Sequence, residues 1–242
     1  QVGDRLALAG GGAVAVTLNV QSTAHELKHL LGDSDAVALI TAATTVKRFE
    51  EIRDVVPQCR HLIVADGPES DFERIVAAGP FDLDPPTIDP EDPAVMIYTS
   101  GLTGKPLGAT LTHRNLYTQS NLLGGIYGGT AESRSLAMIP LYHSFGAAAN
   151  MLAPLRIGAG IVLMDRFTLD GIFQTLERHR VSYLCAVPRL FLGMVLHEGA
   201  DKYDLSALKF CITGGAAIPP EYITQFEDRF RIPLREGYGL TE

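Results

Sequence analysis

The sequence predicts an α/β fold in which helices cover both faces of mostly parallel sheets, arranged as two similar subdomains. Short apolar runs alternate with segments of about 10–15 residues whose apolar side chains recur at helical spacing. Such βαβ units place the carboxyl ends of their strands along one edge of a sheet, where ligands bind. Three loops rich in Gly, Ser or His follow predicted strands, at Ser100, His143 and Gly214. We therefore expect the functional residues in these loops.

The second half of the chain shows the alternation most clearly. Thr112 and Asp170 stand where helices should begin, and prolines open two further helices. The predicted strands are residues 94–98, 136–139, 161–164, 181–187 and 208–213, and the predicted helices are residues 112–123, 170–180, 188–195 and 219–230.

The first half is less regular. Thr23 and Glu26 have the spacing of a capping box, and strands are predicted at residues 14–18, 37–40 and 62–64, with a helix near residues 45–55. Residues 79–93 are rich in proline and aspartate, which indicates a linker or surface loop. We place the boundary there, which gives a first α/β subdomain at residues 1–90 and a second at residues 91–242.

The composition excludes several function classes. A net charge of -8 without a Lys/Arg cluster argues against nucleic acid or an anionic membrane as a partner, but a local loop can still bind phosphate. No apolar stretch reaches membrane-span length, and no secretory signal is visible. The three cysteines, Cys59, Cys185 and Cys211, are far apart and form no CxxC pair, which favours a reducing compartment, the cytoplasm.

The segment with the most groups suited to ligand binding is residues 98–108. It holds glycines at 101, 104 and 108, which let a ligand approach the backbone. The hydroxyls of Thr99, Ser100 and Thr103 can donate to phosphate oxygens, and Lys105 can add a charge-assisted contact. Composition alone leaves a flexible surface loop as an equal alternative. The segment is not a Walker-type P-loop, because its glycines are too close and Pro106 follows the lysine.

This segment resembles the signature of the adenylate-forming superfamily, which includes acyl-CoA synthetases, nonribosomal-peptide adenylation domains and luciferases. Three further segments resemble family motifs in the same order, so the resemblance is far more specific than one glycine-rich loop. It points to an AMP-binding acyl-CoA synthetase of the fatty-acid-CoA ligase type. The matching segments are residues 98–108 with 111–115, 140–146, 213–216 with 218–221, and 236–242.

The resemblance implies a role for each motif residue. The first loop would hold the β- and γ-phosphates of ATP, and the glycine-rich strand end would line the adenine and acyl pocket. Tyr238 would stack on adenine, Thr241 would contact the α-phosphate, Glu242 would bind Mg²⁺ and His143 would lie near the reacting carboxylate. The implied phosphate and nucleotide contacts are Thr99, Ser100, Gly101, Thr103, Gly104, Lys105, Gly214, Gly215, Ala216, Tyr238 and Gly239.

The implied reaction activates a carboxylic acid with ATP and Mg²⁺ to give acyl-AMP, and a thiol, usually coenzyme A, then takes the acyl group. The pattern departs from the family at Leu102, where a Thr is usual, and at Leu107, where a Lys is usual. A strand–helix segment that the family has after the position of Arg5 is expected to be missing. The mobile C-terminal domain with its catalytic lysine would lie beyond Glu242. We therefore expect this polypeptide alone to complete no adenylation at a useful rate.

Two other functions are compatible with parts of the sequence. A non-catalytic nucleotide-binding or interaction domain on the same scaffold is favoured by Leu102, Leu107 and the missing C-terminal part. A dinucleotide-binding oxidoreductase is suggested by residues 10–15, which formally fit G-x-G-x-x-A. The second alternative is weak because residues 14–18 are predicted to form a strand where that motif needs a helix. The acyl substrate and the oligomeric state cannot be read from the sequence.

Overall fold

The computed structural model describes residues 11–67, 69–79, 84, 86–99, 105–164 and 167–242. The chain divides into two compact units, one formed by residues 3–113 and the other by residues 114–241. This division lies after the boundary expected near residue 90. It does so because β4 (Pro93–Thr99) pairs with β1 (Ala15–Thr17) and therefore belongs with the first unit.

The first unit contains two small sheets. One has the order β1-β4-β5, with β5 (Leu107–Thr112) antiparallel to β4, and the other pairs β2 (Ala38–Thr41) with β3 (His61–Val64) in parallel. Its helices are α2 (Ala24–Asp33), α3 (Ala43–Glu50), the 3-10 helix Arg53–Val55 and α4 (Asp71–Ala77). Leucines of α2 and Phe49 of α3 form its buried core with Leu39 and Cys59.

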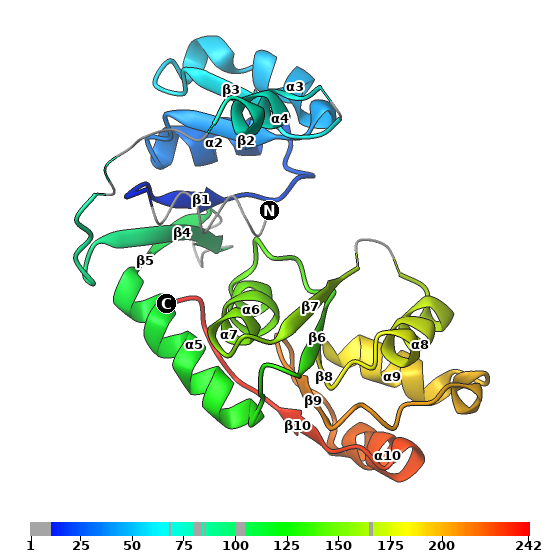
Figure 1. Cartoon of the computed structure of the whole chain (residues 1–242). Helices are drawn as coiled ribbons and strands as arrows, with labels where there is room; N and C mark the ends of the chain where they lie inside the picture. Colours follow the sequence, from blue (N-terminus) through cyan, green and yellow to red (C-terminus); the bar gives the residue numbers. More distant parts are fainter. Residues whose placement is uncertain (1–10, 68, 80–83, 85, 100–104, 165–166) are drawn as a thin grey trace. The chain divides into compact units, whose positions relative to one another are not determined.

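The second unit is built on a five-stranded sheet in which every strand pair is parallel. The strand order is β10-β9-β8-β6-β7 (Figure 1). The strands are β6 (Arg134–Ala137), β7 (Gly160–Leu163), β8 (Tyr183–Ala186), β9 (Phe210–Thr213) and β10 (Leu234–Glu236). In the described part of the chain β4–β5 is the one antiparallel pair, so the prediction of an α/β fold with mostly parallel sheets is confirmed.

Helices cover both faces of the five-stranded sheet because successive side chains of a strand point to opposite faces. Leu184 and Cys211 pack on one side in a core that includes Phe173, Phe191 and Phe226. Tyr183 and Cys185 pack on the other side in a separate cluster with alanines of the α6–α7 segment. The helices are α5 (His113–Tyr127), α6 (Ser144–Ala147), the π-helix Ala148–Leu152, α7 (Ala153–Arg156), α8 (Leu169–Arg178), α9 (Pro188–Leu196), the 3-10 helix Ala200–Lys202 and α10 (Pro220–Phe230).

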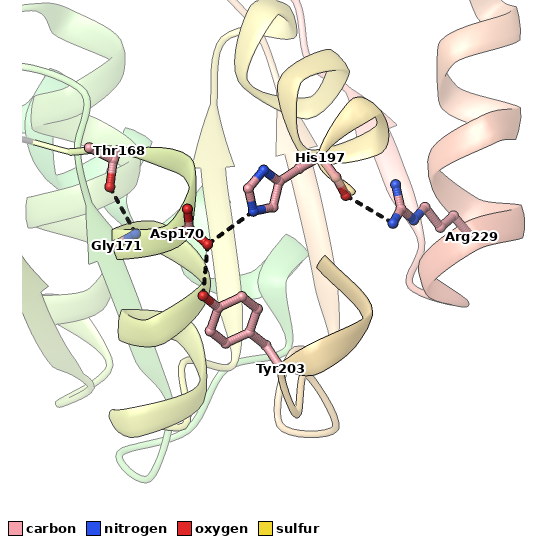
Figure 2. Close-up of polar contacts among 6 residues, drawn as sticks. All are labelled: Thr168, Asp170, Gly171, His197, Tyr203 and Arg229. Atoms are coloured by element: carbon pink, nitrogen blue, oxygen red, sulfur yellow. Dashed lines mark hydrogen bonds and ion pairs between the residues drawn. The ribbon is translucent and has the colours of Figure 1, made fainter. Parts of the chain in front are cut away.

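The first turn of α8 corrects one sequence prediction. Thr168, not Asp170, is the N-cap residue, and its hydroxyl accepts a hydrogen bond from the amide of Gly171 at 3.1 Å. Asp170 instead accepts hydrogen bonds from Tyr203 at 2.9 Å and from Nε2 of His197 at 3.1 Å (Figure 2). The hydrogen bond from Tyr203, followed by that from His197, lowers the pKa of Asp170.

The same cluster ties three helices together. Arg229 of α10 donates to the carbonyl oxygen of His197 at 2.9 Å, at the end of α9 (Figure 2). The ring of Phe173 in α8 stacks with those of His197 and Tyr203, nearly parallel to each, and each pair of ring centroids is 5.4 Å apart. The polar contacts therefore rest on a buried aromatic side chain.

Sequence reasoning missed several short elements: α4, β5, β10, the helical run of α6, π-helix and α7, and the 3-10 helix Ala200–Lys202. The glycine-rich run near residue 10 is followed directly by β1, as expected, and not by a helix. A dinucleotide-binding loop needs a helix at this point, because the helix N-terminus holds the pyrophosphate. The oxidoreductase alternative therefore has no structural support.

All three cysteines are buried and reduced. Burial raises the pKa of the Cys59 thiol, and it raises the pKa of Cys211 further. Cys59 belongs to the core of the first unit, whereas Cys185 and Cys211 lie on opposite faces of the five-stranded sheet. These thiols act as small apolar core residues.

The predicted capping box of α2 is present. The Thr23 hydroxyl accepts from the Glu26 amide at 3.2 Å, and the Glu26 carboxylate accepts from the Thr23 amide at 2.6 Å. We expect Thr23→Ala to lower the free energy of unfolding by about 1 kcal/mol, because amide donors at the helix start lose their partner. Urea denaturation measures this loss. Thr44→Ala, at an exposed position in α3, is the control, and an equal loss there would contradict the capping role.

Candidate functional site at the carboxyl edge of the second unit

The carboxyl ends of all five parallel strands lie along one edge of the sheet. The strand order reverses at β6, since β7 lies on one side of it and β8 on the other. In open α/β sheets a crevice forms at such a reversal and binds ligands. The second motif, residues 140–146, follows β6 at this point, so topology alone places it at the expected position for a site.

Three of the four motifs meet at this edge. A methyl group built on Gly214 would lie 3.0 Å from the carbonyl oxygen of Gly237 and 3.3 Å from the ring of Phe145. The backbone joins the same segments, because Gly214 donates to the oxygen of Ala186 at 3.2 Å and Gly237 donates to that of Thr213 at 2.8 Å. Segments far apart in sequence therefore converge on Gly214. A larger residue at this position would displace the atoms around it.

The second motif presents His143 at the start of α6. Its Nδ1 accepts a hydrogen bond from the amide of Phe145 at 3.2 Å, and the imidazole is exposed. Gly146 lies against the turn before it, since a methyl group there would overlap the carbonyl oxygen of Pro140. This close packing and the cap together fix the direction in which the His143 ring leaves the backbone.

The fourth motif follows β10 without further secondary structure. The side chain of Tyr238 is 92% exposed, which leaves its ring available to a planar ligand. The hydroxyl of Thr241 lies 3.1 Å from that of Ser144, so the fourth motif is hydrogen-bonded to the second. The other site residues predicted here, Gly215, Ala216, Gly239 and Glu242, are exposed.

Two residues of this site were not predicted from the sequence. Ser144 holds Thr241, and the carboxylate of Glu236 accepts from the amide of Ile218 at 3.2 Å, which fastens the loop after β9 to β10. Both stand inside recognised motifs. Their partners are 97 and 18 residues away, and no local pattern indicates such pairs.

The first motif belongs to the first unit. Thr99 ends β4, its hydroxyl lies 3.5 Å from the carbonyl oxygen of Leu107, and Lys105 is exposed. Ser100, Gly101, Thr103 and Gly104, together with Leu102, lie outside the described residues, so their proposed phosphate contacts stay predictions. Leu107, which stands where a Lys was expected, is 57% exposed.

Among the described residues, His, Cys, Asp and Glu side chains form no group of three or more that could hold a metal ion. Magnesium needs no such group of side chains, because one or two carboxylates can bind it together with substrate phosphates. The exposed carboxylate of Glu242 suits that arrangement.

Within the described ranges, no helix has the length and apolar character required to cross a bilayer.

Several known proteins are similar in sequence to this chain. The family described as "AMP-binding enzyme" matches residues 5–242. The chain is 33% identical to 4-coumarate–CoA ligase 1 of Oryza sativa subsp. japonica over 96% of its length and 43% of the relative's. It is 28% identical to the long-chain-fatty-acid–CoA ligase of Bacillus subtilis over 96% of the chain and 47% of that relative. The chain thus spans about half the length of the curated relatives it matches.

Comparison with solved structures identifies the same kind of protein. The inhibitor-bound N-terminal domain of FACL13 from Mycobacterium tuberculosis is similar with a TM-score of 0.89 and 25% identity, over 98% of this chain and 59% of that one. The match covers both units. The chain therefore belongs to the AMP-binding enzyme family and corresponds to the N-terminal domain of its acyl-CoA ligases.

Proposed function

We propose that this chain carries the nucleotide- and acyl-binding part of an ATP-dependent acid–thiol ligase. The observation that carries the proposal is the convergence of Phe145, Gly214 and Gly237 beside the strand-order reversal at β6. In the reaction a substrate carboxylate oxygen attacks the α-phosphorus of ATP, pyrophosphate leaves and acyl-AMP forms. The sulfur of coenzyme A then attacks the acyl carbonyl, and AMP leaves.

The chain's own residues position the substrates in this proposal. Tyr238 stacks on adenine, residues 214–216 line the adenine and acyl pocket, and Thr241 donates its hydroxyl to the α-phosphate. Ser144 keeps the Thr241 hydroxyl in place through their 3.1 Å contact. His143 lies beside the reacting carboxylate, and the hydrogen bond from the Phe145 amide to its Nδ1 fixes the orientation of the ring. Residues 99–105 hold the β- and γ-phosphates.

Glu242 is the proposed carboxylate ligand for Mg²⁺. When bound, this ion neutralises charge on the transferring phosphate group. Phosphate chemistry of this kind depends on positioning and charge neutralisation and needs little covalent participation by the protein. The relatives reported above act, by name, on an aromatic and an aliphatic acid, so the proposal stops at a carboxylic acid.

Calorimetric titration with a non-hydrolysable acyl-adenylate analogue and Mg²⁺ tests this function. We expect Tyr238→Ala to weaken binding about tenfold or more, because stacking of a base on an aromatic ring contributes roughly 1–3 kcal/mol. Tyr117→Ala, which removes another exposed tyrosine from the same unit, should leave the affinity unchanged. Absence of binding by the folded, unsubstituted chain would refute the proposal.

A non-catalytic nucleotide-binding domain is the second candidate, and the exposed apolar side chain of Leu107 at an expected lysine position favours it. The same titration separates the two functions. A ligase site recognises the acyl group, so it should bind the acyl-adenylate analogue more tightly than AMP. Equal affinities for the two ligands would favour the non-catalytic domain.

A further inference from the structure

The helix that follows the second motif contains a π-turn. Residues 144–156 form α6, the π-helix and α7 without a break, and the π-helix lies against β6 (Figure 1). The amide of Ala153 donates to the carbonyl oxygen of Ala148, five residues earlier. Pro154 has no amide hydrogen, so it cannot donate to the carbonyl oxygen of Asn150, as a regular α-helix would require. The sequence itself therefore favours the wider turn, and such turns are frequent at functional sites.

Asn150 is a polar residue in the middle of this π-helix, and its side chain is completely buried. Its Nδ2 donates to the carbonyl oxygen of Leu136 in β6 at 2.8 Å. Its Oδ1 has no hydrogen-bond partner among the described residues. A buried oxygen without a partner is unfavourable and offsets the gain from the bond to Leu136, so Asn150 contributes little to net stability. Its value to the protein lies in where it holds the helix.

The bond between Asn150 and Leu136 closes a loop around His143. Leu136 lies in the strand that leads into the second motif, and Asn150 lies in the helix that leaves it. Between these two residues, Gly146 packs against the carbonyl oxygen of Pro140, and the His143 side chain caps α6. The two ends of the loop are thus joined in the interior, while the imidazole is exposed.

We propose that Asn150 is a positioning residue that fixes His143 relative to β6 and thereby raises the affinity of the site for an acyl-adenylate. The inference rests on the role proposed above for His143. A side chain whose backbone already has the bound arrangement loses less freedom when the ligand binds, so preorganisation increases affinity. Asn150 acts through His143 and does not touch the ligand, because its own side chain is completely buried.

Two substitutions remove the amide of Asn150. Asn150→Leu replaces it with an apolar side chain of similar size, and Asn150→Met replaces it with a flexible one that adapts to irregular space. Both delete the unpaired Oδ1 together with the bond to Leu136, so the unfolding temperature should shift by less than about 4 °C. Thr175→Val is the matched control, because it deletes another side-chain hydrogen bond to a backbone carbonyl, that of Gly171 in α8 at 2.7 Å.

Amide hydrogen exchange without ligand, measured by NMR, tests the contact itself. The amide of Phe145 donates to Nδ1 of His143, so its exchange rate reports whether the cap is held. We expect this amide to exchange about threefold to tenfold faster in both Asn150 variants and at an unchanged rate in Thr175→Val. Unchanged exchange in both Asn150 variants would mean that the packing of Gly146 alone fixes His143. That result would overturn the inference without affecting the proposed function.

Calorimetric titration with 5′-O-(N-acetylsulfamoyl)adenosine tests the consequence for binding. This acyl-adenylate analogue has a small acyl group, so it makes little demand on the size of the acyl pocket. We expect Asn150→Leu to weaken binding about fivefold in the natural background but less than about twofold in a His143→Ala background, because residues that act through one another are not additive. Thr175→Val should leave the affinity unchanged in both backgrounds.

The two backgrounds also show how the inference could fail. Equal weakening by Asn150→Leu with and without the His143 side chain would mean that Asn150 acts on the site by another route, and it would overturn the inference. If the unsubstituted chain does not bind the analogue, the proposed function fails and the role of Asn150 in ligand binding fails with it.

Discussion

Phe173→Ala is expected to lower the free energy of unfolding of the second unit by about 3–5 kcal/mol. The side chain is fully buried in the core beneath α8. It stacks on His197 and Tyr203 and lies 6.1 Å from the ring of Phe230. Alanine would leave a cavity and would remove the surface on which the Asp170 hydrogen bonds rest. Urea denaturation followed by circular dichroism measures the loss.

Phe167→Ala is the matched control for this prediction. Phe167 precedes the same helix, but it is 54% exposed, so its removal creates no cavity. We expect a change within about 0.5 kcal/mol. Similar losses in the two variants would show that packing around Phe173 is not the source of the effect.

Gly146→Ala is expected to lower the free energy of unfolding by about 3 kcal/mol and to weaken binding of the acyl-adenylate analogue. The added methyl group would overlap the carbonyl oxygen of Pro140 and lie 2.9 Å from that of Ile139. Both atoms belong to the backbone, so the turn before His143 must move, and overpacking of this kind costs about 1–3 kcal/mol. Thermal unfolding and calorimetric titration report the two effects.

Gly125→Ala gives the opposite expectation. Gly125 lies in α5, and a methyl group there meets nothing within 4 Å. Alanine should therefore stabilise the helix by about 0.5–1 kcal/mol through its higher helix propensity. Loss of stability at Gly125 as large as that at Gly146 would contradict the close-packing argument.

Local chemistry made much of the fold predictable. The capping box of α2, the proline-led start of α9 and the alternation of buried strands with helices depend on neighbours within a few residues, and all three appear in the structure. β5 was missed because its glycine and threonine residues give no clear apolar pattern, although pairing with β4 stabilises it. Thr168 and Asp170 both suit an N-cap, and only the distant partners of Asp170 decide between them.

Part of the candidate site could also be predicted from the sequence. The predicted parallel strands placed the loops at His143 and Gly214 on one edge of a sheet, and Gly214 lies close to Phe145 in the structure. The fourth motif joins them through Gly237, but it follows β10, a strand that the sequence did not predict. The pair formed by Ser144 and Thr241 could not be foreseen, because it depends on how the chain returns to β6 after passing through four other strands. Sequence patterns therefore identify which loops matter, whereas tertiary contacts decide which side chains are held in place.

The buried cysteines allow the opening of each unit to be measured separately in the same experiment. A thiol reagent can modify Cys59 only when the first unit opens, and it can modify Cys185 or Cys211 only when the five-stranded sheet opens. Where opening is fast and reversible, the labelling rate is proportional to the population of the open form. Mass spectrometry of the labelled peptides would therefore report two opening equilibria from one chain, with no substitution needed to introduce a labelling site.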